Sequence, residues 1–319
     1  MPKNYRKGFA EKYMKEIELK LSFPRKLSAK VYSELSALWG KPVSSSVLQN
    51  TYYDTPDFAM QRSTTALRLR DLGDAWEQTL KGGGKGIAGL HVRDEWNWRL
   101  PDNKLDIAKL SEIELVKGIE LERVGPVFET NFERTKWMVE VGSSVFELAL
   151  DIGEIRGAGG VKPISEIEIE LKEGDVSCVM VVADRIAKQV PCWLSKKSKA
   201  ARGYSLAGIA AAKREHDPER SISVLLDELI DDLACYMEAI ADGDGTNWYK
   251  YVECIAGINS LLTLSGSKRS SVGLDVEVEI ESLFHWMCRK EGSDFSKYVL
   301  NSKAPGLIGL EVLRRELTN

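Results

Sequence analysis

Charged and apolar residues alternate one by one in two separate segments, which is the pattern of a β-strand with one buried face. In the segment 13–23 the charged face holds Glu16, Glu18 and Lys20. In the segment 161–172 it holds Glu166, Glu168 and Glu170. Each strand on its own fits an ordinary amphipathic strand whose charged face lies in water. Two strands that each carry aligned carboxylates also fit a divalent-cation site, because hard cations such as Mg²⁺ prefer carboxylate oxygens.

Further alternating segments predict a mostly antiparallel sheet. They cover residues 43–54, 65–72, 75–81, 91–100, 128–141 and 145–155. Gly73-Asp74 and Gly142–Ser144 separate neighbouring segments, as expected of hairpin turns. The glycine-rich run Gly82–Gly86 is predicted to be a flexible connector. About eight antiparallel strands can close into a barrel.

Apolar residues at helical spacing predict helices between and after these strands. The predicted helices cover residues 27–39, 105–122 and 175–189, and then 225–233, 252–262, 276–288 and 306–317. We therefore expect an α+β fold in which a barrel with flanking helices, residues 1–214, precedes a small all-α domain, residues 215–319. The segment Glu215–Arg220 is the expected linker.

Charge is distributed unevenly along the 319 residues, although the net charge is only −4. Residues 1–214 hold 34 Lys and Arg against 29 Asp and Glu, a balance of +5, whereas residues 215–319 hold 10 against 19, a balance of −9. Nothing in the overall charge indicates a nucleic-acid binder. The basic part is the better candidate for binding an anion.

Cysteine usage and the N-terminus indicate a cytoplasmic protein. The chain has five cysteines, an odd number without Cys-x-x-Cys spacing, so we expect neither a disulfide framework nor a zinc site. The first eight residues lack an apolar core, and no apolar run approaches a membrane-spanning length. We therefore expect no signal peptide and no membrane association.

Basic residues also share strand faces with acidic ones. The residues concerned are Arg68, Arg70, Lys81, Arg93, Glu95, Arg134 and Lys136. If the sheet closes with these faces inward, its lumen holds many charges of both signs. Burying an unpaired charge costs several kcal/mol, so the charges must pair, stay hydrated or bind a ligand. A polyanion with a divalent metal meets this demand, because Arg grips phosphate oxygens and carboxylates hold the metal.

The ordered set of these motifs resembles the CYTH superfamily, also called the triphosphate tunnel metalloenzymes. The matching residues are Glu16-x-Glu18-x-Lys20, Tyr52–Asp57, Leu67–Arg70, Thr79–Lys81, Arg93 with Glu95, Arg134, Asp151, Glu168 with Glu170, and Ser198–Tyr204. The resemblance covers residues 14–205, and its details are most similar to bacterial inorganic triphosphatases with a C-terminal helical extension. It implies an eight-stranded antiparallel β-barrel that forms a tunnel.

The resemblance also implies roles for these residues. Mg²⁺ or Mn²⁺ would be held by Glu16, Glu18, Glu168 and Glu170. The triphosphate would be bound by Lys20, Arg68, Arg70, Lys81, Arg134 and Lys199, and the charge pattern adds Arg93 and Lys136. The expected catalytic set is Glu16, Glu18, Lys20, Lys81, Glu95 and Asp151. Glu95 and Asp151 would hold metal, water or basic residues in place.

The expected activity is metal-dependent hydrolysis of inorganic triphosphate to pyrophosphate and phosphate. Three alternatives remain open at this point: a thiamine triphosphatase, a class IV adenylyl cyclase, and a polyphosphate-binding module without turnover. The extension of similar proteins is often a CHAD domain. Here it is acidic, with only His216 and His285, so we expect a truncated or divergent CHAD-like module that packs on the barrel or binds a protein partner.

Overall fold

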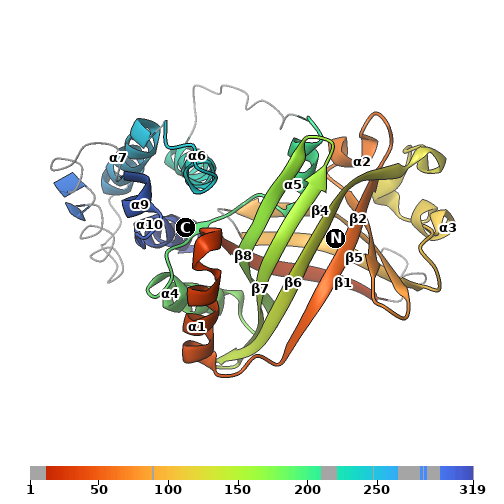
Figure 1. Cartoon of the computed structure of the whole chain (residues 1–319), viewed down its shortest axis with the longest axis horizontal. Coiled ribbons are helices and arrows are strands. Elements are labelled where there is room, and N and C mark those ends of the chain that lie inside the picture. The colour runs from red at the N-terminus through yellow and green to blue at the C-terminus, as the bar shows by residue number, and fades with distance from the viewer. Residues whose placement is uncertain are drawn as a thin grey trace.

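A computed structural model describes residues 12–87, 90–209, 221–246, 248–264, 281–282, 284–285 and 295–318. Its centre is a closed antiparallel barrel with strand order β5-β4-β3-β2-β6-β7-β8-β1, completed where β1 pairs with β5 (Figure 1). The strands are β1 (Lys12–Ser22), β2 (Ser44–Asp54), β3 (Ala66–Asp71), β4 (Trp76–Ile87), β5 (Leu90–Leu100), β6 (Gly125–Val141), β7 (Ser144–Gly157) and β8 (Gly160–Glu173). A short β9 (Trp193–Leu194) pairs with β1. The predicted eight-stranded α+β barrel is confirmed.

The glycine run belongs to a strand, so the predicted flexible connector is wrong. Strand β4 continues to Ile87 across a bulge between Gly82 and Lys85. A side chain at Gly84 would place its Cβ 2.0 Å from the carbonyl oxygen of Val92. Glycine here permits the bulge and the close approach of β5, and it does not break the ladder.

Helices flank the barrel and follow it in the chain. They are α1 (Ser28–Trp39), α2 (Ala59–Arg62), α3 (Ile107–Ser111), α4 (Val179–Ala187), α5 (Lys199–Leu206), α6 (Ile222–Ala241), α7 (Trp248–Leu264), α9 (Phe295–Val299) and α10 (Ala304–Thr318). None of the described helices is long and apolar enough to cross a lipid bilayer. The predicted helix 276–288 falls almost wholly outside the described residues.

The predicted helix over 105–122 is mostly wrong. The structure has the short α3 there, followed by two 3₁₀ turns, Glu114–Val116 and Leu121–Arg123. Gly118 lies between these turns with φ +85°, a left-handed conformation that ends regular helix.

The apolar faces of the barrel strands point outward and are covered by helices. Leu19 and Ile167 of the barrel share one buried cluster with Ile186 of α4. The same cluster continues without a break into Ile230 of α6 and Leu310 of α10. The C-terminal helices therefore pack against the outside of the barrel, while its inside is left for charged side chains.

Helix α5 packs at the end of the barrel where β7 turns into β8. Its residues Ala200 and Tyr204 are buried against Phe128 and Phe132 of β6. The rings of Tyr204 and Phe128 meet edge to face at 5.1 Å. Gly203 faces the same ring so closely that an added Cβ would lie 2.2 Å from Phe128. This close packing fixes the position of Lys199, the first residue of α5.

Candidate active site

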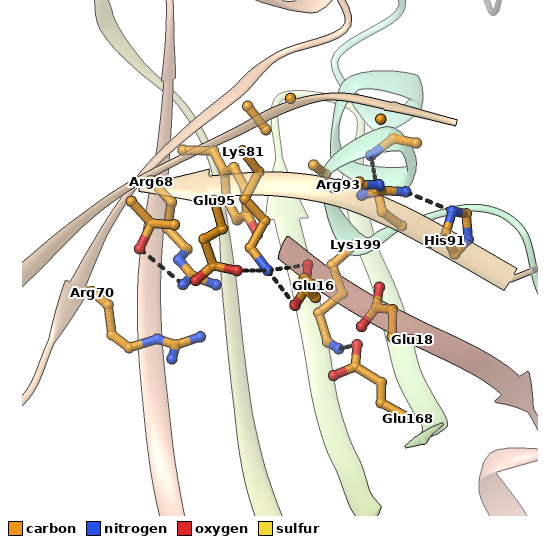
Figure 2. A pocket seen from close by; sticks show the side chains of 18 of the residues that line it. Glu16, Glu18, Arg68, Arg70, Lys81, His91, Arg93, Glu95, Glu168 and Lys199 are labelled. Atoms are coloured by element: carbon orange, nitrogen blue, oxygen red, sulfur yellow. Dashed lines mark hydrogen bonds and ion pairs between the residues drawn. The ribbon is translucent and has the colours of Figure 1, made fainter. Parts of the chain in front are cut away.

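The barrel holds a cavity of about 1130 Å³, and half of the residues that line it are charged (Figure 2). The predicted site residues that line it are Glu16, Glu18, Lys20, Arg68, Arg70, Lys81, Arg93, Glu95, Arg134, Lys136, Glu168, Glu170 and Lys199. Asp151 is fully buried behind the wall and is absent from this lining. The strand alternation explains the gathering, because inward-facing residues of eight strands must share one lumen.

Three carboxylates form a row across neighbouring strands. Glu170 of β8 lies opposite Glu18 of β1 on one side and opposite Glu147 of β7 on the other. Side chains directly opposite in an antiparallel pair have Cβ atoms about 4.5–5.5 Å apart, and like charges there destabilise the sheet. The ammonium nitrogen of Lys172 lies 2.7 Å from the carboxylate of Glu170 and offsets part of the negative charge of the row. The oxygen donors of this row line the cavity, and carboxylate oxygens are the ligands that a divalent cation such as Mg²⁺ prefers.

Lys20 connects Glu18 of this row to Glu168, another inward-facing carboxylate of β8. Its ammonium nitrogen lies 3.3 Å from Glu18 and 3.2 Å from Glu168, which is its direct partner in the β1–β8 ladder. Burial lowers the pKa of Lys20, but Glu18, Glu168 and Glu166 outweigh burial and raise the pKa above its usual value. Burial likewise raises the pKa of Glu18, and Lys20 reverses that effect and lowers it. Both groups are therefore charged at neutral pH.

Lys81 links two carboxylates on the neighbouring strands β1 and β5. Its nitrogen lies 2.7 Å from Glu16 and 2.8 Å from Glu95 (Figure 2). Burial raises the pKa of Glu16, and the negative charges of Glu18 and Glu95 raise it further. Together these effects outweigh Lys81, which lowers the pKa. Burial also raises that of Glu95, but Lys81 and Arg68, with a hydrogen bond from Asn97, lower the pKa to about 2. Glu16 is thus the carboxylate of this pair that is more easily protonated.

A second, deeper network lies around Lys199. Ser198 caps α5 by accepting a hydrogen bond from the backbone N–H of Ala201, which sets Lys199 at the start of the helix. Its nitrogen then lies 2.5 Å from Asp151, 2.5 Å from Glu166 and 3.0 Å from Glu168. Those three acidic residues are close enough together to hold a metal ion. The ammonium group of Lys199 contacts all three, so this cluster already has a cation, and Glu168 is the one of the three that also lines the cavity.

Arg134 also contacts this network. Its guanidinium donates two hydrogen bonds to Asp151, at 2.7 and 2.6 Å, and pairs with Glu168. Asp151 therefore contacts Arg134 and Lys199 from behind the cavity wall.

The wall formed by β3 carries more positive charge than its surroundings neutralise. Arg68 and Arg70 each approach Glu77 only to 3.9 Å. The Nε atom of Arg68 is buried without a hydrogen-bond partner in the described chain. Burial, then Arg68 and Arg134, lowers the pKa of Arg70 to about 9. A half-buried arginine pair that meets its carboxylate partner only at 3.9 Å is suited to binding an anion such as phosphate.

His91 lines the cavity too, although it was not among the predicted site residues. Nη2 of Arg93 lies 2.9 Å from its Nδ1 (Figure 2). Arginine can only donate hydrogen bonds, so Nδ1 accepts and the neutral ring carries its proton on Nε2. Burial, then Lys20 and Arg93, lowers the pKa of His91 to about 3. His91 is therefore a neutral ring opposite Glu18 in the β1–β5 ladder, and its buried Nε2 has no hydrogen-bond partner among the described residues.

The predicted site set left out Glu147 and Glu166, and sequence reasoning missed Asn97 altogether. Glu147 and Glu166 lie on the same strand faces as Asp151 and Glu168, so the alternation was a sufficient signal for them. Asn97 links Thr79 to Glu95 through hydrogen bonds of 2.7 Å each. Its neutral side chain gave no signal in a search for charges.

Comparison with known proteins matches residues 14–204 to the CYTH domain. A curated relative, the inorganic triphosphatase of Haemophilus influenzae, is 34% identical over 194 residues. That match covers 60% of this chain and 55% of the relative, so the chain spans about half the length of the relative it matches. Two solved structures match at 20% identity. One is a putative adenylyl cyclase from Hippeastrum described as having a dominant triphosphatase activity, with TM-score 0.45 over 63% of this chain and 100% of that one. The other is a putative adenylate cyclase from Bacillus halodurans, with TM-score 0.41 over 60% of this chain and 97% of that one.

Proposed function

Because the chain belongs to the CYTH domain family, we propose that it hydrolyses inorganic triphosphate to pyrophosphate and phosphate inside the barrel. The observation that supports the proposal is that acidic and basic residues line different sides of one cavity. Carboxylates of β1 and β8 line one side, and Arg68 and Arg70 of β3 line another. Such a cavity can bind a polyanion and a cation together, whereas an uncharged substrate would leave the arginines without anions.

The residues fit Mg²⁺ or Mn²⁺, which Glu16, Glu18, Glu168 and Glu170 would hold. When bound, a divalent cation neutralises phosphate oxygens and acidifies water. Substrate positioning falls to the basic residues of the cavity, which are Lys20, Arg68, Arg70, Lys81, Arg93, Arg134, Lys136 and Lys199. They would stabilise charge that develops on the equatorial and leaving oxygens as water attacks the terminal phosphorus and pyrophosphate leaves.

Three substrates separate this activity from its alternatives. Phosphate release from tripolyphosphate and thiamine triphosphate, and cyclic AMP release from ATP, should be measured with Mg²⁺ and with Mn²⁺. We expect tripolyphosphate to give the highest kcat/KM. Tight tripolyphosphate binding without product would instead identify a binding module, and cyclic AMP with pyrophosphate would identify a cyclase.

Two substitutions test the site itself. Glu18→Gln and Glu168→Gln should each lower metal-dependent phosphate release by about 100-fold or more, because each removes a charged oxygen donor. Glu140→Gln changes an exposed glutamate of β6 and should leave turnover unchanged. Wild-type turnover in either cavity variant would overturn the metal assignment.

A further inference from the structure

A row of hydrogen-bonding side chains crosses three neighbouring strands of the cavity wall. Thr79 of β4 lies opposite Arg68 of β3 on one side and opposite Asn97 of β5 on the other. All three residues line the cavity. Glu95 lies two residues before Asn97 on β5, so both side chains point to the same face of the sheet. The ladder therefore places two neutral side chains between a cation and an anion.

The hydrogen bonds along this row run in one direction. Nη2 of Arg68 donates to Oγ1 of Thr79 at 3.0 Å, and the Thr79 hydroxyl donates to Oδ1 of Asn97 at 2.7 Å. Nδ2 of Asn97 then donates to the carboxylate of Glu95 at 2.7 Å. A guanidinium can only donate and a carboxylate can only accept, so the two ends fix the orientation of both neutral groups. Reversing the Asn97 amide would turn its oxygen toward the oxygens of Glu95.

The two neutral side chains connect opposite charges without pairing them. Within the described chain, Arg68 and Glu95 form no direct ion pair, and the hydrogen bonds of Thr79 and Asn97 join them instead. A direct pair would neutralise the guanidinium, whereas a hydroxyl acceptor orients it and leaves its charge for an anion. Thr79 is buried, so bulk water does not compete with it for the arginine.

We propose that Thr79 and Asn97 are positioning residues that hold Arg68 in the direction in which it binds a phosphate oxygen. The proposal rests on the proposed function and deepens it. Thr79 gives the guanidinium a fixed acceptor at Nη2, while Nε has no hydrogen-bond partner among the described residues, so donors remain for the substrate. Asn97 fixes the Thr79 hydroxyl and anchors the row on Glu95. An arginine held in this way loses less conformational freedom when phosphate binds.

Binding of tripolyphosphate, measured by calorimetry without metal, tests the role of Thr79. Thr79→Val keeps the shape of the side chain but removes the acceptor, so Kd should rise about tenfold, which is about 1.4 kcal/mol. Thr79→Ser keeps the hydroxyl and should bind nearly as tightly as wild type. KM in the metal-dependent phosphate assay should follow the same order. A Thr79→Val protein that binds as tightly as wild type would overturn the proposal.

A double-mutant cycle separates the positioning of Arg68 from a general structural effect. In an Arg68→Ala background the acceptor has nothing left to orient, so Thr79→Val should change Kd by about twofold or less. Asn97→Leu breaks the row one step further along, so it should weaken binding on its own and add little to Thr79→Val. An equal loss from Thr79→Val with and without Arg68 would show that Thr79 does not act through the arginine, and the proposal would fail.

The matched control is Thr135→Val. Thr135 is also a buried threonine on a strand, and its hydroxyl lies 3.2 Å from that of Ser45, away from the residues that line the described cavity. This change should leave binding at the wild-type level, and a loss as large as that of Thr79→Val would count against the proposal. If wild type binds tripolyphosphate but releases no phosphate, the proposed function fails, while the binding cycle still decides the role of Thr79 and Asn97.

Discussion

The ammonium nitrogen of Lys199 lies 2.5 Å from the carboxylate of Asp151, although the two residues are 48 positions apart in the chain. The contact joins α5 to β7 behind the cavity wall. It also fills a group of acidic side chains that could otherwise accept a metal ion. Lys199 therefore helps to hold the barrel together as well as to charge its lumen.

Replacing Lys199 with methionine should destabilise the protein strongly. The change leaves Asp151, Glu166 and Glu168 buried without their shared cation, and breaking a buried pair in this way costs about 3–5 kcal/mol. The free energy of unfolding, measured with urea at pH 7, checks the size of the loss.

Lys30→Met is the control for this measurement, because Lys30 is exposed on α1. It should change stability by only a few tenths of a kcal/mol. A Lys199→Met protein as stable as this control would show that the buried network does not depend on its lysine.

Glu95 should make stability depend on pH in acid. Its pKa is lowered to about 2 in the folded protein, so the folded state prefers its ionised form. Its contribution is therefore fully present above pH about 4.5, its usual pKa, and is lost as the pH falls toward 2. The shift corresponds to roughly 3 kcal/mol. In urea unfolding series, the stability difference between wild type and Glu95→Gln should shrink across this range.

An exposed carboxylate provides the comparison. Asp74 pairs with Arg99 at a position where its side chain is 77% exposed, so Asp74→Asn should show little pH-dependent difference from wild type. A constant difference between Glu95→Gln and wild type from pH 5 to pH 2 would contradict the ionised, paired state of Glu95.

The ring of His91 should stay neutral and keep a single tautomer. Its pKa of about 3 and the donor Arg93 at Nδ1 both predict a proton on Nε2 alone. Nitrogen-15 NMR of histidine-labelled, metal-free protein should show an unprotonated Nδ1 and a protonated Nε2 from pH 5 to pH 8. The His91→Asn variant identifies the signals by their loss.

Arg93→Ala supplies the contrast, because it removes the donor at Nδ1. The tautomers of His91 should then mix, and the two nitrogen signals should move toward each other. A doubly protonated ring in wild type at neutral pH would contradict the desolvated position of His91 beside Lys20.

Gly203→Ala should displace α5 and lower turnover. The new Cβ would lie 2.2 Å from the ring of Phe128, a clash that must move the helix and its Lys199. We expect a stability loss of about 1–3 kcal/mol and a fall in kcat for tripolyphosphate. The double variant with Phe128→Leu should recover part of both, since the smaller side chain makes room. Equal losses with and without that second change would indicate that the ring is not the obstacle.

Strand alternation predicted most of the barrel because burial on one face and charge on the other repeat every two residues. Alternation predicted that Asp151 faces the inside of the barrel, but it could not predict that this side chain is fully buried. That burial depends on α5, which brings Lys199 against Asp151 from a distant part of the chain. The same limit applies to His91, whose role follows from the neighbouring Arg93 side chain. The glycine run misled the prediction, because close packing of β4 on β5 demands small residues just as a flexible connector does.

The apolar cluster that runs from Leu19 through Ile186 to Leu310 has a consequence for how the protein unfolds. Elements that share one buried apolar cluster cannot unfold separately without exposing apolar surface to water. A fragment that stops at residue 214 would expose Trp193 and Leu194 to water, because α10 and α6 cover these residues in the full chain. Heating or denaturant should accordingly melt the β-sheet and the C-terminal helices in one cooperative step.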